Sequence, residues 1–151
     1  LQDLPVSCVA IDNRSGAERV VDYLARAEHR EIATITGDLK TQAGLERLEG
    51  FVKAMKARQL AVHDAYIRFG DFGLPSARAA TEALLALKDR PTAVFVASDD
   101  MALEAINVAL AKGVRVPEEL SVVGFDDNPI AAHARDWSIA RESREEREMC
   151  D

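Results

Sequence analysis

The side chains best suited to bind a small molecule follow the predicted strands of this sequence. They occur in the segments Gly37-Asp38, Gly70-Asp71-Phe72, Ser98-Asp99-Asp100 and Asp126-Asp127-Asn128, with Arg47 in the helix predicted after the first segment. In an open parallel sheet, ligands bind beyond the carboxyl ends of the strands. Carboxylates and arginine hold hydroxyl groups through charge-assisted hydrogen bonds, while an aromatic ring packs on an apolar face. The pattern predicts a site for a sugar, a nucleobase or a similar polar metabolite.

Each of these residues also has a purely structural alternative. Asp99 and Asp126 could serve only to cap the helices that follow them. Phe72 could be a loop anchor, and Arg47 could lie in solvent. Their shared position at strand ends favours the binding interpretation. Two neighbouring carboxylates are expected to face solvent or a helix dipole, namely Asp100 and Asp127.

The strands that would position these segments alternate regularly with helical stretches. Several of them are nearly continuous apolar runs, as in parallel strands that are covered on both faces. The predicted strands are Val6–Ile11, Ile32–Thr36, Ala65–Phe69, Ala93–Ala97 and Val122–Phe125. The order βαβαβαβαβ predicts a doubly wound parallel sheet with the three layers α/β/α.

Start and stop signals for helices lie between these strands. Ser15-Gly-Ala-Glu18 has the form of a capping box, which predicts a helix start at Ser15. Thr41 can cap the next helix, whose core-facing stripe is predicted at Leu45, Leu48, Val52 and Met55. Pro75 suits the first turn of a helix that is predicted to end at Leu87. Ser98 or Asp99 can cap a further helix, which is predicted to run to Lys112. Gly113 and Pro117 are the signals that end this helix.

The composition is that of a globular, acidic domain. Of 151 residues, 48% are hydrophobic and 30% are charged, and the formal net charge is −7. Phosphate binding depends on clustered lysine and arginine, so direct binding of nucleic acid is not expected. No apolar run reaches the roughly 18 to 20 residues of a membrane span, and the first residues lack a secretory signal. No membrane contact is therefore expected.

The sequence carries no pattern typical of an enzyme or a metal site. GxSxG, P-loop, GxGxxG and HExxH motifs are absent. A phosphoaccepting receiver domain would need an acidic pair after its first strand, where Asp12-Asn13-Arg14 stands instead, and a late lysine. Cys8 and Cys150 lie far apart and are expected to be reduced, as in the cytoplasm. We expect no catalytic residue, no metal and no cofactor.

The run Arg90–Asp127 closely resembles the C-terminal subdomain of lactose-repressor-type (LacI/GalR) transcription regulators. It reads RPTAVFVASDDMALEAINVALAKGVRVPEELSVVGFDD. Further matches are Ile11-Asp12-Asn13 with Gly16, His29–Ala33 with Gly37, and Arg47–Phe51. The combination is specific, and the resemblance covers Val6 to about Glu148.

The resemblance implies a cytoplasmic repressor or activator whose core is similar to periplasmic sugar-binding proteins and closes on an effector. Arg47 falls on the family's effector-binding arginine, and Phe72 falls on its stacking aromatic. Asp126 falls on an aspartate that bonds effector hydroxyls or ring nitrogens. Ser98 falls on a polar contact that is often Asn, and Asp99 is the acidic residue of that motif.

The resemblance also implies a homodimer. The helix Met101–Ala111 and the segment Ala131–Trp137 are similar to the family's subunit interface. The interface residues expected on the helix are Met101, Ala105, Val108 and Ala109.

The chain departs from the family in extent and at single positions. By comparison with the family, we expect these 151 residues to lack the helix-turn-helix, the hinge helix and most of the N-terminal subdomain, so that operator DNA would be bound only through a domain outside them. We expect residues 1–140 to form the C-terminal effector-binding subdomain, with a remnant of the N-terminal subdomain at about 1–28. Residues 141–151 are expected to be a charged tail or short helix. Ser98 leaves the effector class open, and Glu28 replaces the usual Gly before His29.

The expected function is the effector-binding and dimerisation part of a LacI-type regulator, with a sugar or related metabolite as effector. A solute-binding module of a sugar transport system would share the fold and is the alternative. An enzyme would need a nucleophile, metal or cofactor site that the sequence does not show.

Overall fold

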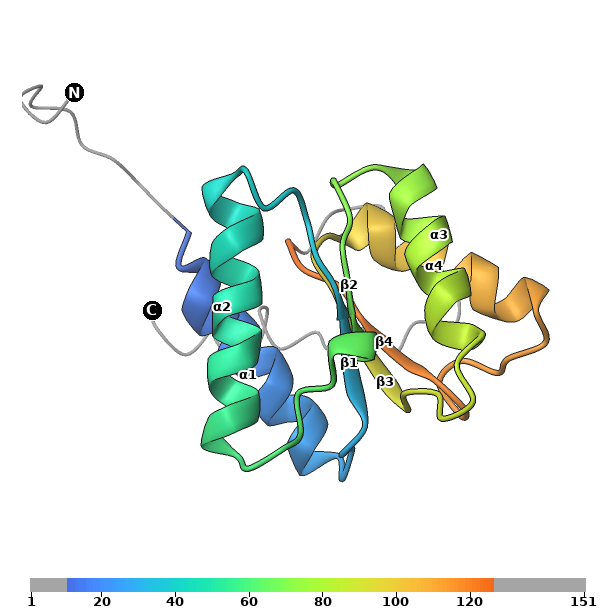
Figure 1. Cartoon of the computed structure of the whole chain (residues 1–151), viewed down its shortest axis with the longest axis horizontal. Helices are drawn as coiled ribbons and strands as arrows, with labels where there is room; N and C mark the ends of the chain where they lie inside the picture. The colour runs from blue at the N-terminus through green and yellow to red at the C-terminus, as the bar shows by residue number, and fades with distance from the viewer. Residues whose placement is uncertain (1–10, 127–151) are drawn as a thin grey trace, which may run out of the picture.

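The computed structural model describes residues 11–126, which form an α/β fold with one parallel sheet (Figure 1). The strands lie side by side in the order β2-β1-β3-β4, and every neighbouring pair is parallel. The elements in chain order are α1 (Asn13–Arg26), β1 (Ile32–Ile35), α2 (Gln42–Ala57), the short 3-10 helix η1 (Asp64–Tyr66), β2 (Ile67–Arg68), α3 (Leu74–Leu85), β3 (Ala93–Val96), α4 (Asp99–Ala111) and β4 (Ser121–Val123).

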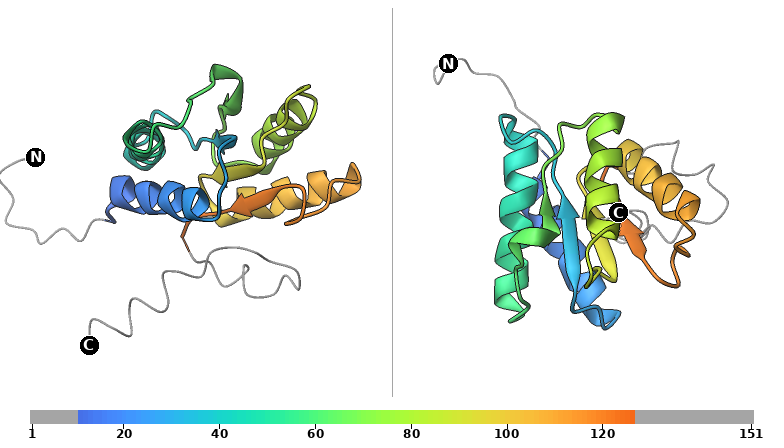
Figure 2. Two further views of the ribbon diagram at one scale, coloured as in Figure 1. Left: turned by 90° about the horizontal axis from the view of Figure 1, so that it is seen from below. Right: turned by 45° about the vertical axis from the view of Figure 1, so that its right-hand side comes forward.

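The helices cover both faces of this sheet. Figure 2 shows α1 and α2 on one side of the strands and α3 and α4 on the other. A separate apolar cluster lies on each face, one around Phe51 and Phe95 and one around Met101 and Val94. All four residues of β1 and of β3 are buried, as the continuous apolar runs predict. The prediction of a doubly wound parallel sheet is therefore confirmed.

The strand bounds agree with the sequence pattern at the centre of the sheet and less well at its edges. β1 and β3 end one residue earlier than predicted. The predicted strand Ala65–Phe69 is reduced to two residues, because η1 occupies its beginning. The strand predicted at Val6–Ile11 lies outside the described residues, apart from Ile11.

The start of α1 differs from the prediction. Asp12, not Ser15, is the N-cap, and its carboxylate accepts a hydrogen bond from the Ser15 backbone N–H at 3.1 Å. The Ser15 hydroxyl donates to the same carboxylate at 2.7 Å. The carboxylate three residues before Ser15 therefore takes the capping role, and the helix begins at Asn13.

The other helix signals behave as the sequence predicts. Thr41 accepts a hydrogen bond from the Gly44 backbone N–H at 3.1 Å, and Ser98 caps α4 through the Met101 backbone N–H. Pro75 lies in the first turn of α3. Gly113 follows α4 with a φ of +77°, the left-handed conformation that ends a helix at little cost for glycine.

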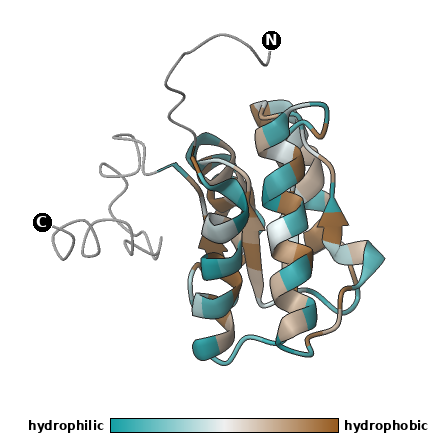
Figure 3. Ribbon diagram, turned by 90° about the vertical axis from the view of Figure 1, so that its left-hand side faces the viewer, coloured by the Kyte–Doolittle hydropathy of each residue, from teal (hydrophilic) through white to brown (hydrophobic). Residues whose placement is uncertain are grey.

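The buried stripe of α2 agrees with the prediction only in part. Met55 is buried as predicted, together with Arg47 and Phe51, which were not predicted, whereas Leu45 is 43% exposed. Leu48 and Val52 are half-buried. Figure 3 shows this side of the molecule, where α2 lies between α1 and the edge strand β2. The helix is rotated relative to the prediction because Arg47, a charged residue, belongs to its inner face.

The helix α1 lies within the segment predicted as a remnant of the N-terminal subdomain, about 1–28, and the domain bounds stay a prediction. α1 packs on α2 and the sheet, and its residues Ala17, Val21 and Leu24 share a core cluster with Phe51 and Phe95. The segment predicted as a charged tail, 141–151, lies outside the described residues.

Among the described residues, no helix has the length and apolar character to cross a membrane. The same part of the chain contains no group of three or more His, Cys, Asp or Glu side chains arranged to hold a metal ion.

Candidate functional site

The guanidinium of Arg47 lies at the centre of a polar cluster at the carboxyl edge of the sheet. Its Nε donates to the Asn13 Oδ1 at 2.9 Å, and its Nη1 donates to the Ala97 carbonyl. Nη2 donates to the Asp126 Oδ1, also at 2.9 Å. Arg47 is only 6% exposed, so the alternative of a solvated arginine is wrong.

Burial of this charge is compensated by its neighbours. An isolated charge in an apolar interior is strongly unfavourable, whereas one that is paired and hydrogen-bonded is tolerated. Asp126 supplies the opposite charge, while Asn13 and Ala97 supply neutral acceptors. Arg47 is therefore a residue on which the fold depends, in addition to any contact with a ligand.

Two aromatic rings lie close to the same guanidinium. The Arg47 Cζ is 3.9 Å from the centroid of the Phe125 ring and 5.9 Å from that of Phe72. Both distances are within the range in which a cation is attracted to a ring face. The cluster thus combines a charge, a carboxylate and two rings.

Each ring ends against a glycine. A Cβ built on Gly16 would lie 2.6 Å from the Phe125 Cζ, and a Cβ on Gly37 would lie 2.1 Å from the Phe72 Cζ. Real Cβ atoms do not approach so closely, so any larger residue at either position would displace a ring. The two glycines make room for the rings beside Arg47.

The carboxylate of Asp126 remains accessible although it is paired. Its side chain is 41% exposed, and its bond to Arg47 leaves acceptor capacity on both oxygens. The residue has a φ of +98°, and Phe72 has a φ of +68°, conformations that side-chain-bearing residues rarely adopt. Such strain is often found at ligand sites. Any helix that Asp126 could cap lies outside the described residues.

Phe72 is presented by a turn that its neighbour Asp71 closes. The Asp71 Oδ1 accepts hydrogen bonds from the Gly73 backbone N–H at 2.8 Å and from the Ser76 hydroxyl at 2.7 Å. These bonds, first that of Ser76 and then that of Gly73, lower the pKa of the Asp71 carboxyl. Phe72 itself is half-buried, so the alternative of a loop anchor stays open beside a binding role.

The two predicted site residues at the start of α4 lie differently. Ser98 is half-buried and follows Ala97, whose carbonyl accepts from Arg47, while the Ser98 hydroxyl accepts the capping hydrogen bond from the Met101 backbone N–H. Asp99 is only 2% exposed, and its carboxylate packs against Gly124. Its burial favours a structural role, and the contact between Asp99 and an effector stays a prediction.

The four residues predicted to form a subunit interface are buried. Met101, Ala105 and Ala109 belong to the core cluster on the α3 and α4 face of the sheet, and Val108 is 3% exposed. The subunit interface stays a prediction. The outer face of α4 carries exposed Asn107 and Leu110 instead.

Asn13 and Phe125 belong to the cluster but were not predicted as site residues. Asn13 stands at the start of α1, where its type resembles an ordinary helix-start residue, and Phe125 reads as the last apolar residue of a strand. The strand-end rule could have included Phe125, which directly precedes Asp126. Nothing in the spacing of Asn13 and Arg47 shows that they meet.

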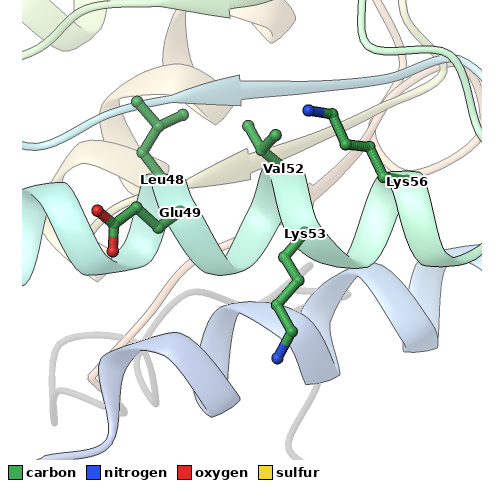
Figure 4. A pocket seen from close by; sticks show the side chains of 5 residues that line it. All are labelled: Leu48, Glu49, Val52, Lys53 and Lys56. Carbon is green, nitrogen blue, oxygen red and sulfur yellow. The ribbon is translucent and has the colours of Figure 1, made fainter.

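A shallow hollow lies elsewhere, on the outer face of α2. Figure 4 shows the residues that line it, namely Leu48, Glu49, Val52, Lys53 and Lys56. Glu49 and Lys53 are already paired with α1, through Arg14 at 2.6 Å and Glu18 at 2.8 Å. This hollow contains none of the predicted site residues.

His29 lies at the opposite, amino end of the sheet. Its Nδ1 is 2.8 Å from the Thr92 hydroxyl oxygen, and burial lowers the pKa of the imidazole. A hydrogen bond between two loops is consistent with a structural role for this histidine.

Known proteins with similar sequences are transcriptional regulators. The family described as periplasmic binding protein-like domain matches residues 21–142. The HTH-type transcriptional regulator CelR of Thermobifida fusca is 43% identical over 129 residues, which are 85% of this chain and 38% of CelR. The HTH-type transcriptional repressor CytR of Escherichia coli K12 is 39% identical over 83% of this chain and 37% of CytR. The chain thus spans well under half the length of these relatives.

Solved structures agree with this relationship. A complex of the regulator CelR with cellobiose superposes with a TM-score of 0.81 at 43% identity, covering 85% of this chain and 39% of the other. A sugar-binding LacI-family regulator from Escherichia coli, solved with phosphate, gives a TM-score of 0.80 at 33% identity, covering 83% and 45%. The chain belongs to the periplasmic binding protein-like family, in the form found in LacI-family transcriptional regulators.

Proposed function

We propose that this chain is part of the effector-binding domain of a LacI-type transcriptional regulator and binds a sugar or related metabolite at the carboxyl edge of its sheet. The observation that carries the proposal is the arrangement around Arg47, in which a half-exposed Asp126 carboxylate lies beside two aromatic rings. The relatives named above are regulators, and neither an enzyme nor a transport receptor is among them.

The chemistry of the cluster suits a hydroxylated ring. Asp126 can accept hydrogen bonds from adjacent hydroxyl groups, while Arg47 holds that carboxylate in place. Phe72 offers an aromatic face to the apolar side of a sugar ring. Ser98 adds a hydroxyl close to the same edge. The cellobiose in the CelR structure supports a carbohydrate as the first ligand to test.

Regulation would require parts beyond the described residues. Operator DNA would be bound by a separate DNA-binding domain, in agreement with the acidic charge of −7. The protein would act in the cytoplasm, as a homodimer. If α4 contributes to that dimer, it does so through its outer face, where Leu110 is 53% exposed.

NMR titration of the 15N-labelled chain tests this proposal, because it detects millimolar affinities. The probes are cellobiose, glucose, galactose and adenosine. We expect one class of probe to shift the amide signals of Asp126 and Gly37 together with the Arg47 Nε–H signal. If no probe shifts these signals, or if the shifts gather at the α2 hollow, the proposal is wrong.

Asp126→Asn with Asp100→Asn as its matched control sharpens the test. Asp126 accepts from Arg47, whereas Asp100 is exposed in the first turn of α4. Loss of the charge at Asp126 should weaken binding by about 1–3 kcal/mol, since hydrogen bonds to charged groups are worth that much. The Asp100 variant should bind as the wild type does.

A further inference from the structure

The backbone of Phe72 is held in a conformation that its residue type disfavours. Its φ is +68°, and its ring tip occupies the space that a Cβ on Gly37 would need. A residue with a side chain adopts left-handed backbone only when its surroundings fix it there. The contacts that fix Phe72 therefore decide where its ring lies.

Asp71 provides these contacts from the adjacent position. Its Oδ1 accepts from the Gly73 backbone N–H at 2.8 Å, so the residues on the two sides of Phe72 are tied together. The Ser76 hydroxyl donates to the same oxygen at 2.7 Å and accepts from the Asp71 backbone N–H at 3.1 Å. The turn is thereby anchored to the first turn of α3.

We propose that Asp71 is a positioning residue of the effector site, which holds the Phe72 ring against Gly37 and beside Arg47. Asp71 is exposed, and its carboxylate is hydrogen-bonded within the turn, to Gly73 and Ser76, so it acts on the site through Phe72. The inference rests on the proposed function, because the ring matters for binding only if an effector packs on it.

The consequence concerns the shape of the binding edge before a ligand arrives. Without the Asp71 carboxylate, the Gly73 N–H loses its acceptor and the Ser76 hydroxyl keeps only the Gly73 carbonyl oxygen, 2.9 Å away. Phe72 can then relax to ordinary backbone. Its ring would then leave Gly37 and its position 5.9 Å from Arg47. Asp71 thus prepares the aromatic face in advance, which lowers the ordering cost of binding.

The position of the ring can be measured without any ligand. The Phe72 ring lies against Gly37, so its ring current must displace the Gly37 Hα signals from their usual positions. Phe72→Leu gives the reference in which that displacement is lost. In Asp71→Ala we expect the Gly37 Hα chemical shifts to equal those of Phe72→Leu. In Asp71→Asn we expect them to equal those of the wild type, because an amide oxygen can accept the same two hydrogen bonds.

Controls separate this effect from a general loss of structure. Asp64→Ala removes another exposed carboxylate, in η1, and should leave the Gly37 signals unchanged. If Asp71→Ala fails to fold, Ser76→Ala, which removes one of the two bonds to Oδ1, provides the second variant and should reduce the displacement. Wild-type Gly37 signals in folded Asp71→Ala or in Ser76→Ala would overturn the inference.

Titration with cellobiose connects the ring to binding. Asp71→Ala should weaken binding by roughly three- to tenfold, the value of one aromatic contact. In a Phe72→Ala background the same substitution should have no effect. If Asp71→Ala lowered the affinity for cellobiose equally in the wild type and in Phe72→Ala, the inference would be overturned while the proposed function would stand. If neither the wild type nor any variant binds any probe of the panel, the proposed function fails, although the Gly37 signals still report the ring position.

Discussion

Gly16 in α1 lies directly against the Phe125 ring, so that a Cβ at Gly16 would come within 2.6 Å of the Phe125 Cζ. The other side of this region is occupied by the Arg47 guanidinium, 3.9 Å from the ring centroid. The ring therefore has little freedom to move, and a helix glycine is required where alanine would ordinarily favour the helix.

Gly16→Ala should consequently destabilise the domain by about 1–3 kcal/mol, the usual effect of overpacking. Urea denaturation of the chain measures this free energy of unfolding. In a Phe125→Leu background the added methyl group meets a smaller side chain, so Gly16→Ala should lower the free energy of unfolding much less. An equal decrease in the wild type and in Phe125→Leu would show that the ring is not the cause.

Two helix ends should gain stability from glycine. Glu28 and Gln59 follow α1 and α2 with φ values of +68° and +56°, and the hydrogen bonds from His29 N to Leu24 O and from Leu60 N to Met55 O close the same type of turn. Left-handed backbone costs a side-chain-bearing residue about 1–2 kcal/mol. Glu28→Gly and Gln59→Gly should each raise the free energy of unfolding by about 0.5–1 kcal/mol.

Gly113 is the natural counterpart, because it already occupies such a turn with a φ of +77°. Gly113→Ala should lower the free energy of unfolding by about 1 kcal/mol, although nothing lies within 4 Å of the added Cβ. A gain in stability on this substitution would contradict the backbone explanation for all three positions.

Loss of Arg47 should unfold the domain more readily as well as weaken binding. Arg47→Ala would leave the buried Asn13 Oδ1 and the Ala97 carbonyl without their donor. Each such acceptor costs about 1–3 kcal/mol, so the total should be at least about 2 kcal/mol by urea denaturation. Arg115→Ala is the control, because Arg115 is 72% exposed and its surface pair with Glu119 is worth at most about 1 kcal/mol. Similar losses in the two variants would argue against a structural role for Arg47.

Acid should loosen the contact between α1 and α2. Hydrogen bonds from Gln42, Asn13 and Arg14 lower the pKa of the Glu46 carboxyl in the folded state. A carboxyl whose pKa is lowered by folding stabilises the fold above its unfolded pKa, and this contribution is lost as the pH falls through the folded pKa. The free energy of unfolding should therefore decline as the pH falls below about 4.5.

Glu46→Gln should make that decline less steep, because the variant cannot be protonated. Glu82→Gln, an exposed position on α3, should keep the wild-type slope. Urea denaturation at a series of pH values measures both slopes. Identical slopes for the wild type and Glu46→Gln would contradict this prediction.

The central strands and several helix ends could be predicted because their causes are local. β1 and β3 are continuous apolar runs, and Thr41, Ser98 and Gly113 act on backbone groups within a few residues. Asp12 was missed as a cap because Ser15 offered an equally plausible local pattern. Local chemistry therefore predicts the position of a helix or strand well. It predicts less well which of two nearby residues is the N-cap of a helix.

The inner face of α2 and the make-up of the site depend on contacts between distant residues. Arg47 meets Asn13 and Asp126 only because three elements converge at one edge of the sheet. Strand-end reasoning brought Arg47, Phe72 and Asp126 together, but it could not show that Asp99 and one side of α4 are buried. Those facts follow from the rotation of each helix about its axis.

One guanidinium connects three separate parts of the fold. Asn13, at the start of α1, and Asp126, after β4, are both hydrogen-bonded to Arg47 of α2. Arg47 is thereby a noncovalent cross-link between segments that are far apart in the sequence, and part of the entropy of bringing them together is offset at a single side chain.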